Sequence, residues 1–170
     1  MNVRKRLPVL VLLGVGLVAA CGEPSLANVQ RVEYRSFGQT ATVIPTEAGK
    51  ASPDDGAGVL GPSYRPSRAG ATLRLRIVFN GLLGRDNEFV VAVFRQGERQ
   101  ALAVASVAGA AGKRVTVDRA IETAAAGSAP VTFLVKVGLA RAGGEVYLNG
   151  GPNGPDTTWP PSYVEIGEKR

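Results

Sequence analysis

The strongest constraint on the fold is an alternation of apolar and polar residues over positions 71–80. Because the side chains of a β-strand point alternately to its two faces, a period of two predicts a strand with one face in a core. The residues of the expected core face are Leu73, Leu75, Ile77 and Phe79. Arg74 and Arg76 fall on the other face, which we therefore expect to meet solvent or a ligand.

Stretches of similar character recur along the rest of the chain. Glycine (22 residues) and proline (11 residues) are abundant, which suits the many turns that short strands need. The expected strands are residues 30–34, 40–44, 71–80, 88–95, 101–107, 115–122, 131–137, 145–149 and 162–168, with a short one near 58–60 inside a long loop over 46–68. Short strands at this spacing predict a single all-β domain, an antiparallel sandwich or barrel.

Residues 88–95 are apolar on both faces, as is typical of strands that are covered on both sides. A sandwich buries only one face of each strand, so the second apolar face needs a further cover, and symmetric association of subunits would provide one. The expected core residues are Phe89, Val91, Val93, Phe133, Val135 and Val137, with Phe94 packed on the opposite face of its strand.

The beginning of the chain has the composition of an export signal. Arg4, Lys5 and Arg6 precede an apolar run over 7–20 that ends in small residues. This run is shorter than the roughly 20 apolar residues that a membrane-spanning helix needs. A charged start, an apolar centre and a small-residue end together predict a removable signal peptide.

Residues Leu17-Val-Ala-Ala-Cys21 resemble the lipobox of bacterial lipoproteins. The resemblance implies cleavage before Cys21 and attachment of lipid, such as palmitate, to its thiol. Acylation would also explain why an exported chain carries a single cysteine. Gly22 at the next position, where an aspartate would favour the inner membrane, implies an anchor in the outer membrane. The expected organisation is a signal peptide at 1–20, a lipidated cysteine and tether at 21–28, and one domain at 29–170.

The order of the expected strands resembles a known family. The likeness rests on Thr42-Val-Ile-Pro45, on Asn87 to Gly97 followed by Ala101-Leu-Ala103, on Thr132 to Gly138, and on Tyr147-Leu-Asn-Gly150 followed by Ser162 to Ile166. Together these stretches resemble the jelly roll of tumour necrosis factor and complement globular heads, in the form found in phage tail-fibre tips and bacterial surface proteins. The resemblance implies an antiparallel jelly-roll β-sandwich that assembles as a homotrimer.

Charge argues against nucleic acid as a partner. The chain has 20 Lys and Arg against 14 Asp and Glu, and three of the basic residues would leave with the signal peptide, so the exported part is near +3. The remaining basic residues are scattered, whereas a phosphate-binding surface needs them clustered on one face.

Catalysis and metal binding find little support in the residue types. The chain has no histidine, so no Ser-His-Asp or Cys-His pair can form. Transition metals lack their preferred ligands, and the oxygen-bearing groups at 85–88 and 153–156 are explained by turn chemistry as readily as by calcium. We therefore expect no enzyme, no metal and no cofactor.

Trp159, Arg74 and Arg76 are the candidate ligand-binding residues. Trp159 lies in a Gly/Pro-rich loop and could stack on a sugar or pack on the domain edge. The two arginines could serve a binding face or a solvated one. The expected function is a lipid-anchored, non-catalytic β-sandwich of the cell envelope that binds a protein or glycan or serves surface display. A carbohydrate-binding module and an envelope hydrolase are the alternatives.

Overall fold

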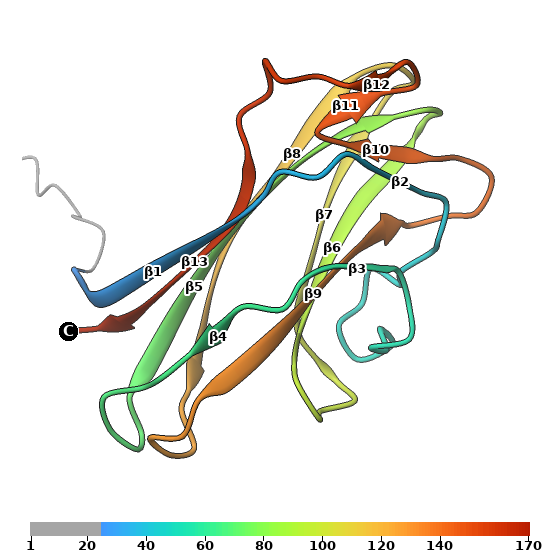
Figure 1. Cartoon of the computed structure of the whole chain (residues 1–170). Coiled ribbons are helices and arrows are strands. Elements are labelled where there is room, and N and C mark those ends of the chain that lie inside the picture. The colour runs from blue at the N-terminus through green and yellow to red at the C-terminus, as the bar shows by residue number, and fades with distance from the viewer. Residues whose placement is uncertain (1–24) are drawn as a thin grey trace, which may run out of the picture.

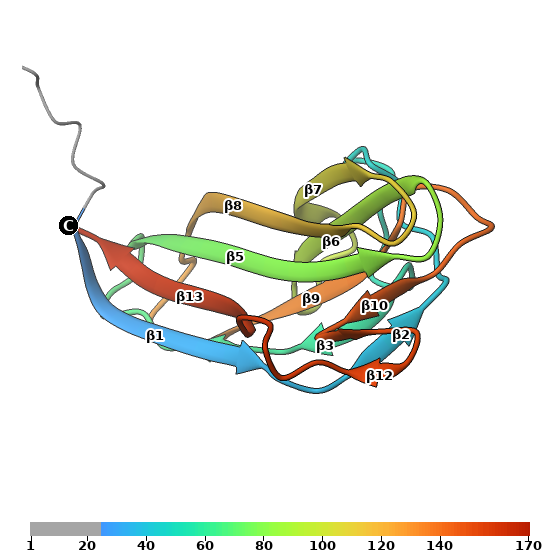
Figure 2. The same cartoon turned by 90° about the horizontal axis from the view of Figure 1, so that it is seen from above.

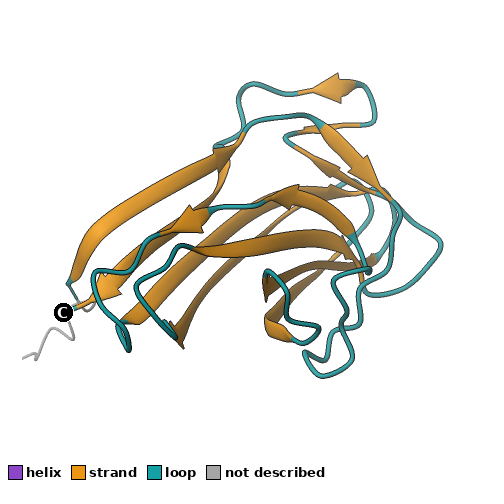
Figure 3. Cartoon of the chain, turned by 60° about the horizontal axis from the view of Figure 1, so that its bottom comes forward, coloured by secondary structure: helices purple, strands orange, loops and turns teal. Residues whose placement is uncertain are grey.

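A computed structural model describes residues 25–170, which form two antiparallel β-sheets packed face to face (Figure 1). Strands and loops account for all of this part of the chain (Figure 3). None of its segments is therefore a helix that could span a membrane. The predictions for residues 1–24, including the lipidation of Cys21, lie outside the described residues.

The larger sheet is built around its longest strand, β5 (Thr72–Leu83). One side of β5 pairs along its length with β8 (Arg114–Ala124). The other side pairs first with β13 (Ser162–Lys169) and then with β10 (Val146–Leu148). The outermost strands beyond these are β1 (Leu26–Tyr34) on β13 and β2 (Gly38–Thr40) on β10.

The second sheet has β9 and β6 at its centre. Its strands, in order across the sheet, are β3 (Ala57–Leu60), β9 (Val131–Leu139), β6 (Asn87–Arg95) and β7 (Ala101–Gly109), with β4 (Ser63–Tyr64) also on β9. A small ribbon of β11 (Gly150–Gly151) and β12 (Gly154–Pro155) follows β10. From β5 to β10 the chain crosses between the sheets at every connection except the β6–β7 hairpin. The predicted antiparallel jelly-roll β-sandwich is therefore confirmed.

The core between the sheets consists of the residues that alternation predicted. Leu73, Leu75, Ile77 and Phe79 of β5 are at most 2% exposed. They share one apolar cluster with the inward residues of β6 and β9. All seven core predictions on these two strands are confirmed: Phe89, Val91, Val93, Phe133, Val135 and Val137 belong to this cluster, and Phe94 is buried on the opposite face of β6.

The predicted strand at 40–44 is wrong beyond its first residue. β2 ends at Thr40, whose hydroxyl accepts a hydrogen bond from the Thr42 backbone N–H at 3.2 Å. The chain then leaves the first sheet, and the backbone N–H of Ile44 donates to the Leu139 carbonyl of the second sheet at 2.9 Å. At the other end, β1 begins at Leu26, three residues inside the predicted tether.

The loop over 42–56 covers the second apolar face of β6. Ile44 and Ala51 of this loop form a separate buried cluster with Val90, Ala92 and Phe94. The loop can lie this close to the second sheet because glycines stand at two contact points. A Cβ on Gly138 of β9 would be 2.7 Å from the Thr42 carbonyl oxygen, and a Cβ on Gly56 would be 2.5 Å from Ile44 Cδ1. The chain's own loop thus provides the cover that we had expected from another subunit, and the homotrimer keeps only the family resemblance as its argument.

The two ends of the sandwich differ in what they carry (Figure 2). At one end, here called the terminal end, β1 begins opposite the last residues of β13, with Leu26 paired to Lys169. At the other end, here called the distal end, the chain turns through the loops over 84–86, 110–113, 140–145 and 149–161. Any group attached before β1 therefore starts from the end opposite these loops.

Replacing Phe133 by alanine tests the core. The side chain is fully buried in the main cluster, so Phe133→Ala should lower the free energy of unfolding by about 3–5 kcal/mol. Denaturant unfolding measures this loss. Val29→Ala is the control, since Val29 is 52% exposed and should change stability by less than about 0.5 kcal/mol. Equal losses for the two variants would contradict the assignment of Phe133 to the core.

Candidate functional site

Trp159 lies at the distal end, in the segment between β12 and β13. Its side chain is only 8% exposed, and the guanidinium carbon of Arg114 lies 4.4 Å from the ring centroid. One ring face is therefore already occupied by a cation–π contact. The indole Nε1 is buried without a hydrogen bond of normal geometry. The structure thus supports edge packing of Trp159 rather than an open platform for stacking.

Asp156 organises the loop around Trp159. Its Oδ1 accepts hydrogen bonds from the Thr158 backbone N–H at 2.9 Å and from the Thr158 hydroxyl at 2.6 Å. Its Oδ2 accepts from Arg114 Nη2 at 2.8 Å. These bonds from Thr158, the charge of Arg114 and the nearby indole hold the pKa of Asp156 below its ordinary value. The carboxylate and Arg114 together fix the position of the indole.

Asn149 forms the other wall of the same region, directly after β10. The residue is 8% exposed and has a positive φ of 53°, a conformation that asparagine tolerates better than most residues. Its Nδ2 donates to the backbone carbonyls of Tyr34 and Ser36, both at 2.9 Å. These two bonds orient the amide and leave Oδ1 as a buried acceptor without a partner.

Asn149 and Trp159 line one hollow of about 210 Å³, here called the Trp159 hollow. Pro155, Asp156, Thr157 and Pro161 line it from the same segment, and Arg35 lines it from beyond β1. Within residues 25–170, three buried side-chain polar atoms lack a hydrogen-bond partner, and two of them belong to residues of this hollow. The sequence singled out Trp159 but gave Asn149 only as the last residue of an expected strand.

Arg74 and Arg76 lie elsewhere. Both are on the outward face of β5, where Arg76 forms a two-pronged ion pair with Asp118 at 3.1 and 2.8 Å. Arg114 of β8, which contacts Trp159, pairs with Leu82, six positions further along β5 than Arg76, which is about 20 Å at strand spacing. The three predicted ligand-binding residues therefore do not form one site.

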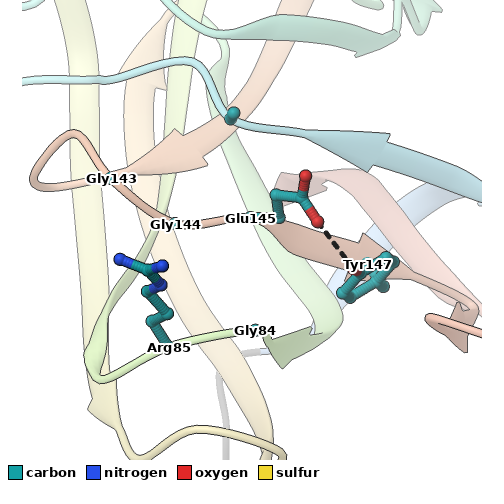
Figure 4. A pocket seen from close by; sticks show the side chains of 7 residues that line it. Gly84, Arg85, Gly143, Gly144, Glu145 and Tyr147 are labelled. Atoms are coloured by element: carbon teal, nitrogen blue, oxygen red, sulfur yellow. Dashed lines mark hydrogen bonds between the residues drawn. The ribbon is translucent and has the colours of Figure 1, made fainter.

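A larger hollow of about 450 Å³, here called the Arg85 hollow, opens between the β5–β6 and β9–β10 loops (Figure 4). Gly84 and Gly144 form part of its wall, and Arg85 reaches across from the β5–β6 loop. The Tyr147 hydroxyl donates to Glu145 Oε2 at 2.6 Å, which raises the pKa of Tyr147. Glu145 and Tyr147 therefore already satisfy each other.

The buried carboxylate at the terminal end has structural partners. Glu168 accepts hydrogen bonds from both the backbone N–H and the hydroxyl of Ser67, which lower its pKa. A carboxylate with a lowered pKa is a weak base, and the chain has no histidine to activate Ser67. This pair therefore holds the loop after β4 against β13 and gives no support to hydrolase chemistry.

The oxygen-bearing turns do not combine into a metal site. Asp86 accepts a hydrogen bond from the Ala111 backbone N–H at 2.8 Å, and Asp156 is bound to Thr158 and Arg114. No three His, Cys, Asp or Glu side chains gather as possible ligands anywhere in 25–170. These carboxylates hold the loops in which they lie.

No protein-family model and no curated protein sequence matches the chain significantly. Among solved structures, the chain is similar to the CBM36-1 domain of a multidomain xylanase from the hindgut metagenome of Trinervitermes trinervoides. Sequence identity is 16%, the TM-score is 0.41, and the match covers 82% of this chain and 97% of that one.

The chain is also similar to Eiger TNF from S. frugiperda, at 9% identity and a TM-score of 0.45, covering 87% of this chain and 94% of that one. A carbohydrate-binding module CBM36 in complex with calcium and xylotriose gives 14% identity and a TM-score of 0.38, covering 81% and 99%. With TM-scores below 0.5, these similarities carry no argument about function, which has to come from the residues of this chain.

Acidification should release the Trp159 loop. Because the pKa of folded Asp156 is lowered, the stabilisation by its carboxylate is complete above the ordinary carboxyl pKa and is lost as pH falls through the lowered value. Trp159 is the only tryptophan, so its fluorescence emission should shift to the red over that pH range. In Asp156→Asn the shift should already be present at neutral pH and should no longer titrate.

Asp118→Asn is the matched control. The pKa of Asp118 is also lowered, through its hydrogen bond to Arg76, but Asp118 lies on the outward face of the larger sheet and away from Trp159. This variant should keep the emission and its acid titration. An Asp156→Asn protein with unchanged emission at every pH would show that the carboxylate does not hold the loop.

Proposed function

We propose that this protein is a lipid-anchored, non-catalytic component of the bacterial cell envelope whose jelly-roll domain presents its distal loops to a ligand. One observation carries the proposal: the chain enters the domain at the terminal end, while the Trp159 hollow and the Arg85 hollow lie at the distal end. An anchor at Cys21 would therefore leave both hollows facing away from the membrane.

Chain lengths support this arrangement. The five residue steps from Cys21 to Leu26 reach at most about 18 Å when extended. β13 spans the domain from the distal end to the terminal end over eight residues, about 26 Å at strand spacing. The terminal end is thus held near the lipid surface, and the distal loops stand a domain length away from it.

The support for the lipid anchor lies in the amino-acid sequence. The Leu17 to Cys21 segment supports cleavage and acylation, for example by palmitate, and Gly22 supports the outer membrane as the destination. A non-catalytic role is supported by a chain without histidine and by carboxylates that serve their own loops. A homotrimer remains a prediction from family resemblance, and light scattering on the purified protein measures it.

A carbohydrate-binding module is the second candidate function. The observation that favours it is a hollow of about 210 Å³ at the distal end, lined by the aromatic Trp159 together with the polar residues Asn149, Asp156 and Thr157. An envelope hydrolase is the third alternative. A broad screen of hydrolase substrates tests it, and we expect the screen to detect no activity.

Removing the acylated thiol should detach the protein. Cys21→Ser should move it from the membrane fraction to the soluble fraction, or leave the signal peptide uncut, because the only cysteine would be lost. Fractionation with mass spectrometry of the amino terminus measures both outcomes. Ser36→Ala, a similarly small change outside the signal, should leave the location unchanged. An unmodified Cys21 on membrane-bound wild-type protein would overturn the anchor.

The orientation has its own test in liposomes that carry brominated lipids. Trp159, at the distal end, should be quenched weakly, because it lies a domain length away from the lipid. In a Trp159→Phe background, Ser128→Trp places the single tryptophan in the β8–β9 loop at the terminal end, where quenching should be stronger. Equal or reversed quenching would contradict a domain that points its distal loops away from the membrane.

A further inference from the structure

The outer edge of β7 is the longest unprotected strand edge in the described part of the chain. β7 pairs with β6 on one side, and no strand within 25–170 pairs with its other side. Its nine residues include neither a charged residue nor a proline. The other long outer strands carry charges, Arg31 and Glu33 in β1 and Asp118 and Glu122 in β8. Charged side chains protect a free edge, which otherwise recruits another strand.

The hydrogen bonds of β9 show which way the backbone groups of its neighbour β6 point. Leu139 of β9 donates its N–H to the Thr42 carbonyl and accepts from the Ile44 N–H, so both of its groups point away from β6. Directly opposed residues of antiparallel strands either exchange both hydrogen bonds or exchange none. Phe89 lies opposite Leu139 and therefore directs its backbone groups to β7 instead.

The same alternation identifies the free groups of β7. Phe89 pairs with Val107, so Val107 and, two positions back, Ala105 form hydrogen bonds with β6. Val104, Ser106 and Ala108 then direct their N–H and C=O groups to the free side. None of these groups has a backbone partner in the described part of the chain. The edge thus offers an alternating row of donors and acceptors.

A hollow of about 310 Å³ lies along this edge, between β7 and β8. Residues 104–107 of β7 line one side of it, and Val117, Asp118 and Arg119 of β8 line the other. The two strands follow the same margin of the sandwich without pairing to each other (Figure 2). A segment that paired with β7 would therefore lie beside the β8 residues of this hollow.

Arg119 brings a positive charge to the hollow. It stands opposite Ile77 in the β5–β8 register, so it belongs to the core-facing side of β8, two residues after the buried Val117. Arg119 is nevertheless exposed, because it lies at the open margin between the sheets. It forms no hydrogen bond or ion pair with any residue of 25–170. The hollow therefore presents a cation without a counterion beside a row of free backbone groups.

These two features together define the chemistry of a partner. A free strand edge binds an extended chain through main-chain hydrogen bonds, and neighbouring side chains provide the specificity. A carboxylate is the strongest side-chain partner for a guanidinium group. β7 itself carries no charge that would repel an acidic segment. A second copy of β7 would pair with the edge but has no carboxylate for Arg119, so the charge favours an acidic peptide over self-association.

We propose that an extended acidic segment of a partner protein adds as a strand to the free edge of β7. Its backbone would bond to Val104, Ser106 and Ala108, and one of its carboxylates would pair with Arg119. This surface lies on the side of the sandwich, apart from the Trp159 hollow and the Arg85 hollow. It therefore adds a protein-binding site that depends neither on the distal loops nor on the lipid anchor.

Synthetic peptides test this surface in the full-length protein. Each probe has about six residues, a usual strand length, and alternates Thr and Val around one Glu that is moved along the series. At least one Glu peptide should bind in calorimetry, about tenfold more tightly than the same peptide with Gln. It should also slow hydrogen exchange at the backbone amides of Val104, Ser106 and Ala108. The same peptide methylated at its backbone nitrogens should do neither, because it cannot pair with a strand.

Two substitutions separate the backbone contacts from the charge. Ser106→Pro removes an outward N–H but no bond to β6 and should abolish binding, whereas Ser106→Ala, which loses the same hydroxyl bond to Glu88, should bind normally. Arg119→Glu should reverse the preference, so that peptides with Lys bind about tenfold more tightly than those with Glu. The same change at the exposed Arg65 should leave the preference unaltered. Thermal melts confirm that each variant is folded.

The outcomes separate this site from its alternatives. Absence of binding and of slowed exchange with every peptide would overturn the strand-pairing site. Equal binding of Glu and Gln peptides, or an Arg119→Glu protein that still prefers Glu, would overturn recognition of an acidic segment. Slowed exchange without peptide that increases with protein concentration would show that a second copy occupies the edge. Loss of the Cys21 anchor in the fractionation experiment would overturn the envelope role and leave this site as a property of the domain.

Discussion

Burial of both faces of β6 is the constraint on which the rest of the structure depends. Phe89, Val91 and Val93 point into the core between the sheets, while Val90 and Phe94 point outward and need a second cover. The loop over 42–56 provides it, and to do so the chain must leave the larger sheet directly after β2. This departure keeps β2 short.

The position of the candidate site follows from the same crossing. β2 pairs with β10, and β10 leads directly into Asn149, whose amide donates to the carbonyls of Tyr34, at the end of β1, and Ser36, in the connection to β2. The segment over 149–161 is therefore attached to the beginning of the chain by side-chain bonds. These bonds fix the loop over 149–161. Its bonding partners lie where they do because the chain that follows them must cross to the second sheet and cover β6.

Alternation made most of the fold predictable from the sequence. β5, β6 and β9 carry large apolar residues at every second position, and such a pattern depends only on neighbours along the chain. The strand expected at 40–44 failed because the Thr40 hydroxyl bonds to the Thr42 backbone N–H and Ile44 is needed on the other sheet. A period-two pattern cannot show which of two sheets a strand-like segment will join.

The site was less predictable because it depends on contacts between distant positions. Trp159 stood out as the only tryptophan, but its contact with Arg114 and the unpartnered oxygen of Asn149 arise from segments separated by tens to over a hundred residues. Arg74 and Arg76 stood out for charge on a strand, and Arg76 has a local partner in Asp118. The local sequence pattern identifies unusual residues, whereas only the folded structure shows which of them are in contact.

Pairing of the two ends of the domain has a practical consequence for protein engineering. Leu26 lies opposite Lys169, and the backbone N–H of Arg170 donates to the Ser25 carbonyl at 3.3 Å. A reporter fused after Arg170 would thus emerge beside the start of β1 and leave the distal loops unobstructed. The same proximity makes circular permutation of residues 25–170 feasible, with a short peptide joining Arg170 to Ser25 and new ends opened at the exposed turn around Gly143.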